Sequence, residues 1–245
     1  MRFARSCLSG VFFAAFAFGS VLLGFLLFPI LPLWGTGPSV QMRMRRLVRS
    51  TYRLFVWAAR VTGLFRVEIS PEDRRRLASL RGHVVVANHI SLIDIIILVA
   101  YLGDSTAVAK SAAARNPFYS RIVRSAFLVN DDPEGVLARA GELVAQGVNM
   151  IVFPEGTRTP PDSSSRRLRR GAAQIALASG APLQPVVIRC DPPVLAKGQP
   201  WHDVGDRTIV YTLKLKDAIP AQPSSIRSHA AAVELTARIC GSLFG

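Results

Sequence analysis

From residue 83 onward, short apolar runs alternate with longer amphipathic stretches, and this alternation limits the possible folds more than any other feature of the sequence. We expect strands at 83–88, 105–109, 126–130, 149–153, 183–189 and 207–216. We expect helices at 91–102, 117–124, 133–146, 169–179 and 225–241. Such alternation predicts an α/β fold with a mostly parallel sheet flanked by helices. The functional groups of these sheets gather where the strands end.

The first forty residues predict contact with a membrane. No residue between Arg5 and Arg43 is charged, and the apolar stretch 10–34 is long enough to cross a hydrocarbon core of about 30 Å. This stretch is longer than the apolar region of a cleaved signal peptide, and no small-residue cleavage site follows it. Pro29 and Pro32 would break a helix near its end, so a re-entrant segment is the alternative to a full span. We therefore assign residues 1–38 to a membrane anchor.

Arginines are more numerous after this segment than before it. Two precede it, and five follow it closely: Arg43, Arg45, Arg46, Arg49 and Arg53. By the positive-inside rule, we expect attachment to the inner membrane with the body of the chain in the cytoplasm. Apolar residues recur at roughly helical spacing over 39–65, which predicts a basic amphipathic helix within a connecting region at 39–70. This helix either lies among anionic headgroups or packs on the domain at 71–245.

The charge of the chain predicts a polyanionic partner. Thirty Lys and Arg against 16 Asp and Glu give a formal net charge of +14, which suits an anionic bilayer or a nucleic acid. The apolar N-terminal segment and the lack of aromatic residues between the arginines disfavour nucleic acid. The three cysteines lie far apart, so they predict neither a disulfide framework nor a metal site.

The first predicted strand ends in "VVVANHISLID", residues 84–94. Ser91 and Asp94 fit a capping box for a helix that begins near Ser91, which accounts for these two residues structurally but not for His89. Asp94 in the first helical turn could accept the Nδ1 proton of His89. The second imidazole nitrogen would then be free to act as a base, so His89 and Asp94 are the candidate catalytic pair.

A second strand end, "MIVFPEGTRT" at 150–159, carries groups that can hold an anion. Gly156 permits close approach of a ligand to the backbone, Thr157 supplies a hydroxyl, and Arg158 supplies a planar guanidinium suited to phosphate or carboxylate. A tight turn with a solvated arginine is the structural alternative.

Together, the NHxSxxD and FPEGTR motifs in this order resemble the glycerolipid acyltransferase family typified by 1-acylglycerol-3-phosphate O-acyltransferase. The resemblance runs from about Val84 to Ile188 and includes "RRLRRGAAQIALASGAPLQPVVI" at 166–188. It implies transfer of an acyl chain from a thioester, acyl-CoA or acyl-carrier protein, to a hydroxyl of a lysophospholipid, first of all 1-acyl-glycerol-3-phosphate. It implies no bound cofactor, since the thioester is a co-substrate. The sequence has no G-x-S-x-G motif, which argues against a serine hydrolase.

The resemblance also implies roles for single residues. His89 held by Asp94 would remove the proton from the attacking hydroxyl, and no acyl-enzyme is needed. Lys110, at the end of the second strand, would add positive charge near the acceptor. The remaining residues expected to bind substrate are Asn88, Ser91, Glu155, Gly156, Thr157 and Arg158.

One position departs from the family pattern. The family usually ends the strand of its second block in an arginine associated with the acceptor phosphate, whereas "SAFLVND" at 125–131 has Asn130 there. A neutral amide cannot replace a guanidinium as an ion-pair partner. Either another cation compensates, or the acceptor is an amino-acid lipid or a polyketide-like lipid. The candidate compensating cations are Lys110, Arg121, Arg124 and Arg158. A non-catalytic protein that binds anionic lipids is a further alternative, but it would not need His89 and Asp94.

Overall fold

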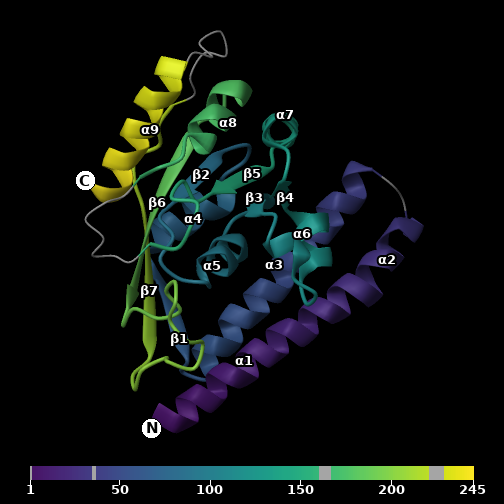
Figure 1. Ribbon diagram of the computed structural model, residues 1–245, viewed down its shortest axis with the longest axis vertical. Helices are drawn as coiled ribbons and strands as arrows, with labels where there is room; N and C mark the ends of the chain where they lie inside the picture. The colour runs from purple at the N-terminus through teal and green to yellow at the C-terminus, as the bar shows by residue number, and fades with distance from the viewer. Residues whose placement is uncertain (1, 35–36, 160–166, 221–228) are drawn as a thin grey trace.

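The computed structural model describes residues 2–34, 37–159, 167–220 and 229–245, with a seven-stranded sheet at the centre (Figure 1). The strands are β1 (Phe65–Ile69), β2 (Val84–Ala87), β3 (Ser105–Lys110), β4 (Leu128–Asn130), β5 (Asn149–Val152), β6 (Leu183–Asp191) and β7 (Ile209–Leu215). Their order is β1-β7-β6-β2-β5-β3-β4, and every neighbouring pair is parallel except β6 and β7. The predicted α/β fold with a mostly parallel sheet is therefore confirmed.

Each of the six predicted strands agrees with one of β2 to β7 to within two residues. The edge strand β1 was not predicted. It pairs with β7, where Phe65 lies opposite Ile209. Because β1 has only five residues and its partner is far along the chain, local pattern carries little information about it.

Six helices of the body surround the sheet. They are α4 (Pro71–Ser79), α5 (Asp94–Tyr101), α6 (Ser120–Ala126), α7 (Pro133–Ala145), α8 (Gly171–Ser179) and α9 (His229–Phe244). The helix predicted at 91–102 begins three residues later than expected, at Asp94. The first residues of the helix predicted at 225–241 lie outside the described part of the chain.

Two hydrophobic cores lie on opposite faces of the sheet. Val85 and Ala87 of β2 pack in the core on the side of α3 and α5, and Val84 and Val86 pack in the core on the side of α7, α8 and α9 (Figure 1). Successive side chains of a strand point to opposite faces, so a strand buried on both faces reads as a continuous apolar run. This explains why the run "VVVA" is entirely buried.

The N-terminal segment forms a long helical rod beside α3 (Pro38–Val61) (Figure 1). It comprises α1 (Arg2–Leu22), a π-helical turn at Leu23–Leu27, α2 (Phe28–Ile30) and a 3-10 turn at Leu31–Trp34. Pro29 lies near the start of α2 and Pro32 in the 3-10 turn, so neither proline ends the rod. Residues Arg2–Leu33 are long and apolar enough to cross a membrane by length and composition alone.

α3 packs on the domain through the face that the amphipathic pattern predicted. Val40, Val48 and Val56 are buried, and Phe12 of α1 makes an edge-to-face contact with Phe55 at a centroid distance of 5.3 Å. Leu54, Trp57 and Val61 of the same helix are 61%, 60% and 65% exposed. The helix therefore has a second apolar strip that the domain does not cover.

One arginine of α3 is buried. Arg45 donates two hydrogen bonds to the Asp104 carboxylate, from Nε at 2.7 Å and from Nη2 at 2.8 Å. Asp104 lies between α5 and β3, so this bidentate pair fixes α3 to the body of the chain. The pair shows that the basic face of α3 is not wholly a surface for solvent or lipid.

Candidate active site

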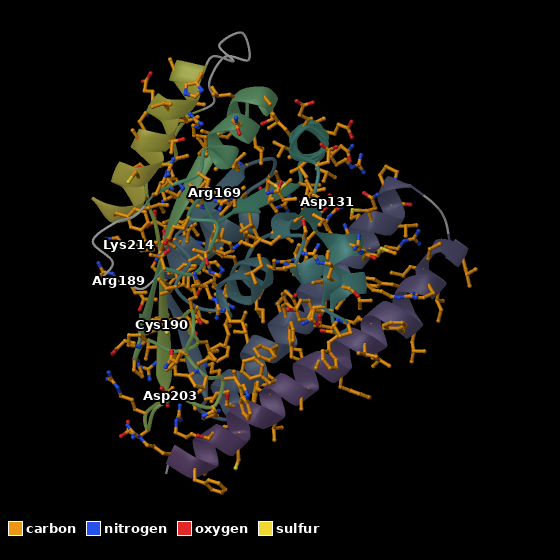
Figure 2. The ribbon with its side chains drawn as sticks, in the orientation of Figure 1. Asp131, Arg169, Arg189, Cys190, Asp203 and Lys214 are labelled. Carbon is orange, nitrogen blue, oxygen red and sulfur yellow. The ribbon has the colours of Figure 1, made fainter. Side chains whose placement is uncertain are left out.

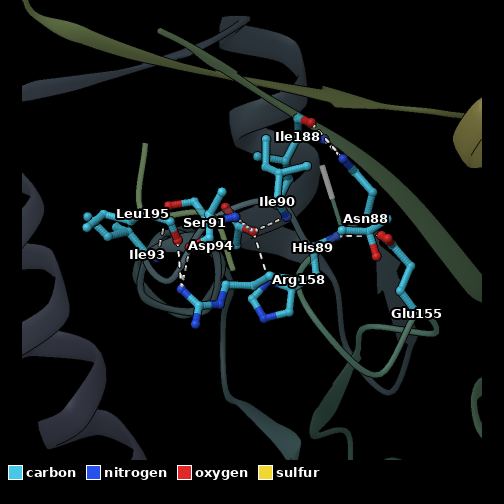
Figure 3. Close-up of polar contacts among 12 residues, drawn as sticks. Asn88, His89, Ile90, Ser91, Ile93, Asp94, Glu155, Arg158, Ile188 and Leu195 are labelled. Atoms are coloured by element: carbon cyan, nitrogen blue, oxygen red, sulfur yellow. Dashed lines mark hydrogen bonds and ion pairs between the residues drawn. The ribbon is translucent and has the colours of Figure 1, made fainter. Parts of the chain in front are cut away.

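His89 and Asp94 meet at the carboxyl end of β2 (Figure 3). His89 lies two residues after the strand, and Asp94 is the first residue of α5. The His89 Nδ1 and the Asp94 Oδ2 are 2.9 Å apart, while the imidazole is 19% exposed and the carboxylate is fully buried. The predicted pair is therefore brought together, with the imidazole reaching solvent and the acid behind it.

The Asp94 carboxylate organises the whole loop between β2 and α5. Its Oδ2 also accepts hydrogen bonds from the backbone N–H groups of Ile90 and Ser91, both at 2.8 Å (Figure 3). Burial raises the pKa of Asp94 above its ordinary value, and the hydrogen bonds from His89, Ser91 and Ile90 oppose this rise. An ionised Asp94 can only accept, so it places a proton on Nδ1 of His89 and leaves Nε2 as the basic nitrogen.

The same hydrogen bonds explain why α5 begins late. The loop N–H groups of residues 90 and 91 bond to the Asp94 side chain, so Ser91 does not serve as the N-cap of α5, which is Ile93. The Ser91 hydroxyl instead makes a 2.7 Å hydrogen bond with the Tyr211 hydroxyl of β7, and both residues are fully buried. One hydrogen bond of the predicted capping box is nevertheless present, from the Ser91 N–H to the Asp94 carboxylate. Ser91 therefore contacts the core and not the open surface.

Asn88 joins β2 to β6. Its Nδ2 donates to the Ile188 carbonyl at 2.8 Å, and its Oδ1 accepts from the Ile188 N–H at 2.7 Å (Figure 3). The side chain is 5% exposed, so both ends of the amide are engaged with the backbone inside the protein. This arrangement holds the end of β2 in register immediately before His89.

Glu155 brings the second motif to the first. Its Oε1 accepts a hydrogen bond from the backbone N–H of His89 at 2.8 Å, whereas its buried Oε2 has no hydrogen-bond partner among the described residues. The side chain is 7% exposed. Phe153, two residues earlier, stacks on the His89 ring with a centroid distance of 4.2 Å and an interplanar angle of 21°. His89 is thus held by Asp94 at its Nδ1, by Glu155 at its backbone N–H and by Phe153 at one face of its ring.

The turn after β5 places the remaining residues of the motif. Gly156 has φ of +66°, which favours glycine, and a Cβ at this position would lie only 2.7 Å from Nε of Arg169. Thr157 is half-buried. Arg158 donates from Nη1 to the Leu195 carbonyl at 2.7 Å (Figure 3). Part of the Arg158 guanidinium is therefore engaged with the loop that follows β6.

Lys110 and Asn130 lie side by side at the carboxyl ends of β3 and β4, in register with each other. Both side chains are exposed. The structure therefore places Lys110 at the same edge of the sheet as His89, two strands away from β2 and across β5. Asn130, the residue that departs from the family pattern, has an exposed position in which a charged side chain would fit.

An open pocket of about 930 Å³ lies beside Glu155, on the side of α7, α8 and α9. Both apolar side chains and three arginines, Arg167, Arg169 and Arg170, line it, with Arg169 labelled in Figure 2. Asn130 lines it as well. In the sequence these arginines belong to the stretch 166–188, and a run of basic residues is most often solvated. The sequence feature that could have indicated them is their position immediately before α8, the helix that precedes β6.

Several contacts could not be inferred from the motifs. Tyr211 comes from β7 and Leu195 comes from the loop after β6. Phe153 is the first residue of the second motif, but its stacking on His89 is not indicated by the motif itself. Among the described residues, no three His, Cys, Asp or Glu side chains lie together in an arrangement that could hold a metal ion. The site thus combines the His89–Asp94 pair with a neighbouring pocket lined by arginines.

This fold places a His–Asp pair at the carboxyl edge of a parallel sheet, an arrangement suited to an enzyme that activates a hydroxyl. The chain belongs to the Acyltransferase family, whose sequence profile it matches over residues 53–189. It is 25% identical over 201 residues to a 1-acyl-sn-glycerol-3-phosphate acyltransferase of Pseudomonas aeruginosa, covering 78% of this chain and 70% of that protein. It is 30% identical over 112 residues to the protein of the same name from Helicobacter pylori, covering 43% and 47%.

Among solved structures, the chain resembles the crystal structure of the 1-acyl-sn-glycerophosphate (LPA) acyltransferase PlsC from Thermotoga maritima. The TM-score is 0.66 at 22% sequence identity, over 98% of this chain and 94% of that one. At this identity the likeness establishes the fold, and it includes the N-terminal helical rod because nearly the whole chain is covered. The family match, and not the likeness of fold, identifies the protein as an acyltransferase.

Proposed function

We propose that the protein transfers an acyl chain from acyl-CoA or acyl-carrier protein to the free hydroxyl of 1-acyl-glycerol-3-phosphate. The observation that carries this proposal is the His89 imidazole, whose Nδ1 lies 2.9 Å from a buried carboxylate while the ring remains partly exposed. The names of the Pseudomonas and Helicobacter relatives support the acceptor.

In the proposed mechanism, Nε2 of His89 removes the proton of the acceptor hydroxyl as its oxygen attacks the thioester carbonyl. A hydroxyl is too weak an acid to react unaided at neutral pH, and a positioned base typically contributes about 10² to 10⁴ in rate. Asp94 stabilises the imidazolium that forms. When the tetrahedral intermediate collapses, the C–S bond breaks and the imidazolium returns the proton to the leaving thiolate. The products are the ester and a free thiol, and no acyl-enzyme forms.

The proposed location is the inner face of the cytoplasmic membrane, with the sheet in the cytoplasm. The apolar rod Arg2–Leu33 and the exposed side chains Leu54, Trp57 and Val61 of α3 support attachment to a bilayer. The arginines of α3 support a preference for anionic lipid. A membrane-bound position suits an acceptor that is itself a membrane lipid.

A second candidate function is acylation of an acceptor without a phosphomonoester, such as an amino-acid lipid. The observation that favours it is Asn130 in place of the family's arginine. Purified full-length protein with labelled acyl-CoA or acyl-carrier protein, offered a panel of lysolipids, tests both candidates. Efficient transfer to lysophosphatidic acid supports the first, and transfer only to phosphate-free acceptors refutes it.

A further inference from the structure

The pocket beside Glu155 contains an arginine in a position to bind an anion. Among the described residues, no ion pair involves Arg169, and its side chain is exposed. The Arg169 N–H donates to the Pro154 carbonyl at 2.7 Å, which ties residue 169 to the turn of the second motif. The Arg169 side chain passes beside Gly156, and any residue with a Cβ at position 156 would displace that side chain. Arg169 is therefore fixed at its base and free at its charged end.

The neighbouring arginines are less available. Arg170 makes a 2.7 Å contact from Nη1 to Nε2 of His229 in α9. Arg158 contacts the carbonyls of Leu195 and Ala196 at 2.7 and 3.3 Å. Arg170 and Arg158 are therefore partly engaged, whereas the Arg169 side chain has no ion pair among the described residues and its backbone is bonded to the turn that carries Glu155.

Two cations that the sequence offered as replacements for the family arginine point elsewhere. The Arg121 guanidinium lies over the ring of Phe25, 4.2 Å from its centroid. Arg124 lines a separate small pocket with Arg121, Gly24 and Phe28, beside the N-terminal rod. Neither arginine lines the pocket that contains Asn130 and Glu155. Lys110 pairs in register with Asn130 but is not among the residues that line the pocket. The arginines before α8 are therefore the cations that line the same pocket as Asn130.

The start of α8 adds a second attractive element. Gly171, the first residue of the helix, lines the pocket, and the first turn has neither an acidic residue nor a side-chain cap. The free N–H groups and the dipole at a helix N-terminus favour a phosphate. Glu155 lines the same pocket while its Oε1 holds the His89 backbone, so an anion bound there lies next to the catalytic loop.

We propose that this pocket binds the phosphate of the acceptor lipid, and that Arg169 supplies the positive charge that Asn130 lacks. The assignment rests on the proposed function, since it concerns the headgroup of the same acceptor. It explains how a chain without the usual strand-end arginine can recognise a phosphomonoester: the cation comes from the segment before α8 and reaches the pocket over Gly156.

Full-length protein in detergent micelles, assayed with acyl-CoA and lysophosphatidic acid, tests the assignment. Arg169→Ala should raise KM for lysophosphatidic acid about tenfold or more, because a charge-assisted hydrogen bond is lost. KM for acyl-CoA and kcat should change less than about twofold, since His89 is untouched. Arg169→Gln, which keeps the side-chain stem over Gly156, should behave like Arg169→Ala if the effect is one of charge.

Two further variants complete the design. Asn130→Arg in the Arg169→Ala background should lower KM for lysophosphatidic acid again, because it returns a cation to the same pocket. Arg189→Ala is the matched control, since Arg189 is an exposed arginine on β6 outside the pocket lining (Figure 2). An unchanged acceptor KM in Arg169→Ala, or an increase confined to acyl-CoA, overturns the assignment. Absence of transfer to lysophosphatidic acid by the wild type overturns the proposed function itself.

Discussion

The backbone N–H of His89 donates a hydrogen bond to Oε1 of Glu155 at 2.8 Å, across the neighbouring parallel strands β2 and β5. The first motif supplies the donor and the second supplies the acceptor. The backbone of His89 is therefore held by Glu155, 66 positions away in the sequence. This bond gives a physical reason for the two motifs to occur together, because the orientation of the histidine depends on both.

Substitution of Glu155 separates a structural role from a chemical one. Glu155→Gln keeps a side-chain oxygen that can accept from His89, whereas Glu155→Ala leaves the N–H unpaired at a cost of about 1 to 3 kcal/mol. We expect Glu155→Ala to lower both kcat and the free energy of unfolding, and Glu155→Gln to retain most of both. Equal losses of kcat in the two variants, with Glu155→Gln as stable as the wild type, would show that the charge of Glu155 takes part in the reaction.

His89→Ala should abolish acyl transfer, with kcat lowered by about 10² to 10⁴, because the proposed general base is lost. Asp94→Asn should lower kcat less, since the imidazole remains with a poorer orientation. His83→Ala is a suitable control because His83 precedes β2 at the opposite end of the same strand. Near-normal turnover by purified, folded His89→Ala would refute the mechanism.

The sequence predicted the elements whose information is local. β2 and β5 read as apolar runs because both faces are covered, and each motif follows such a run directly. β1 was missed because a five-residue strand owes its stability to its contact with β7 and not to its own pattern. Element type thus followed from periodicity, while pairing partners did not.

The candidate site was predictable to the same extent. The bond between His89 and Asp94 spans five residues and could be inferred from the spacing within the motif. The bond between Ser91 and Tyr211 spans 120 residues, and no local pattern indicates it. The orientation of Arg169 likewise depends on the bare face of Gly156, a relation that appears only once the turn and the segment before α8 are packed together.

The buried acid predicts a pH dependence of stability. Burial raises the pKa of Asp94 above its ordinary value of 3.8, so the folded state keeps this proton at pH values where the unfolded chain has released it. The folded state then binds more protons, and its stability falls as the pH rises from about 3.8 through the raised pKa. The Asp94→Asn variant has no carboxyl group at this position, so it lacks this contribution to the pH dependence of stability. Urea unfolding at several pH values should show its stability relative to the wild type increasing with pH across that window, and a constant difference would contradict the raised pKa.

Leu195 adopts a left-handed backbone conformation with φ of 55°, and its side chain is 4% exposed. Its carbonyl accepts hydrogen bonds from Arg158 and from the N–H of Leu92. Leu195→Ala removes buried apolar contacts and keeps the strain, whereas Leu195→Gly removes both. We expect both variants to be less stable than the wild type, with Leu195→Gly the more stable of the two by up to about 1 kcal/mol. The reverse order in thermal unfolding would argue against strain at this position.

Membrane attachment should have two separable parts. We expect apolar contact with the bilayer to hold the rod Arg2–Leu33. α3 carries exposed Leu54 and Trp57 beside a row of arginines. Deleting residues 1 to 38 should leave a chain that binds anionic vesicles at low salt and is released at high salt, because screening weakens attraction between the arginines and the lipid headgroups. The intact chain should remain bound at high salt. Trp57→Ser and Leu54→Ser in the truncated chain should weaken binding further, and neutral vesicles are the control for charge.

Circular dichroism must show that the truncated chain is folded, because the deletion uncovers Phe55. Salt-insensitive binding of the folded, truncated chain would contradict the electrostatic contribution of α3, and fully soluble behaviour of the intact chain would contradict membrane attachment altogether.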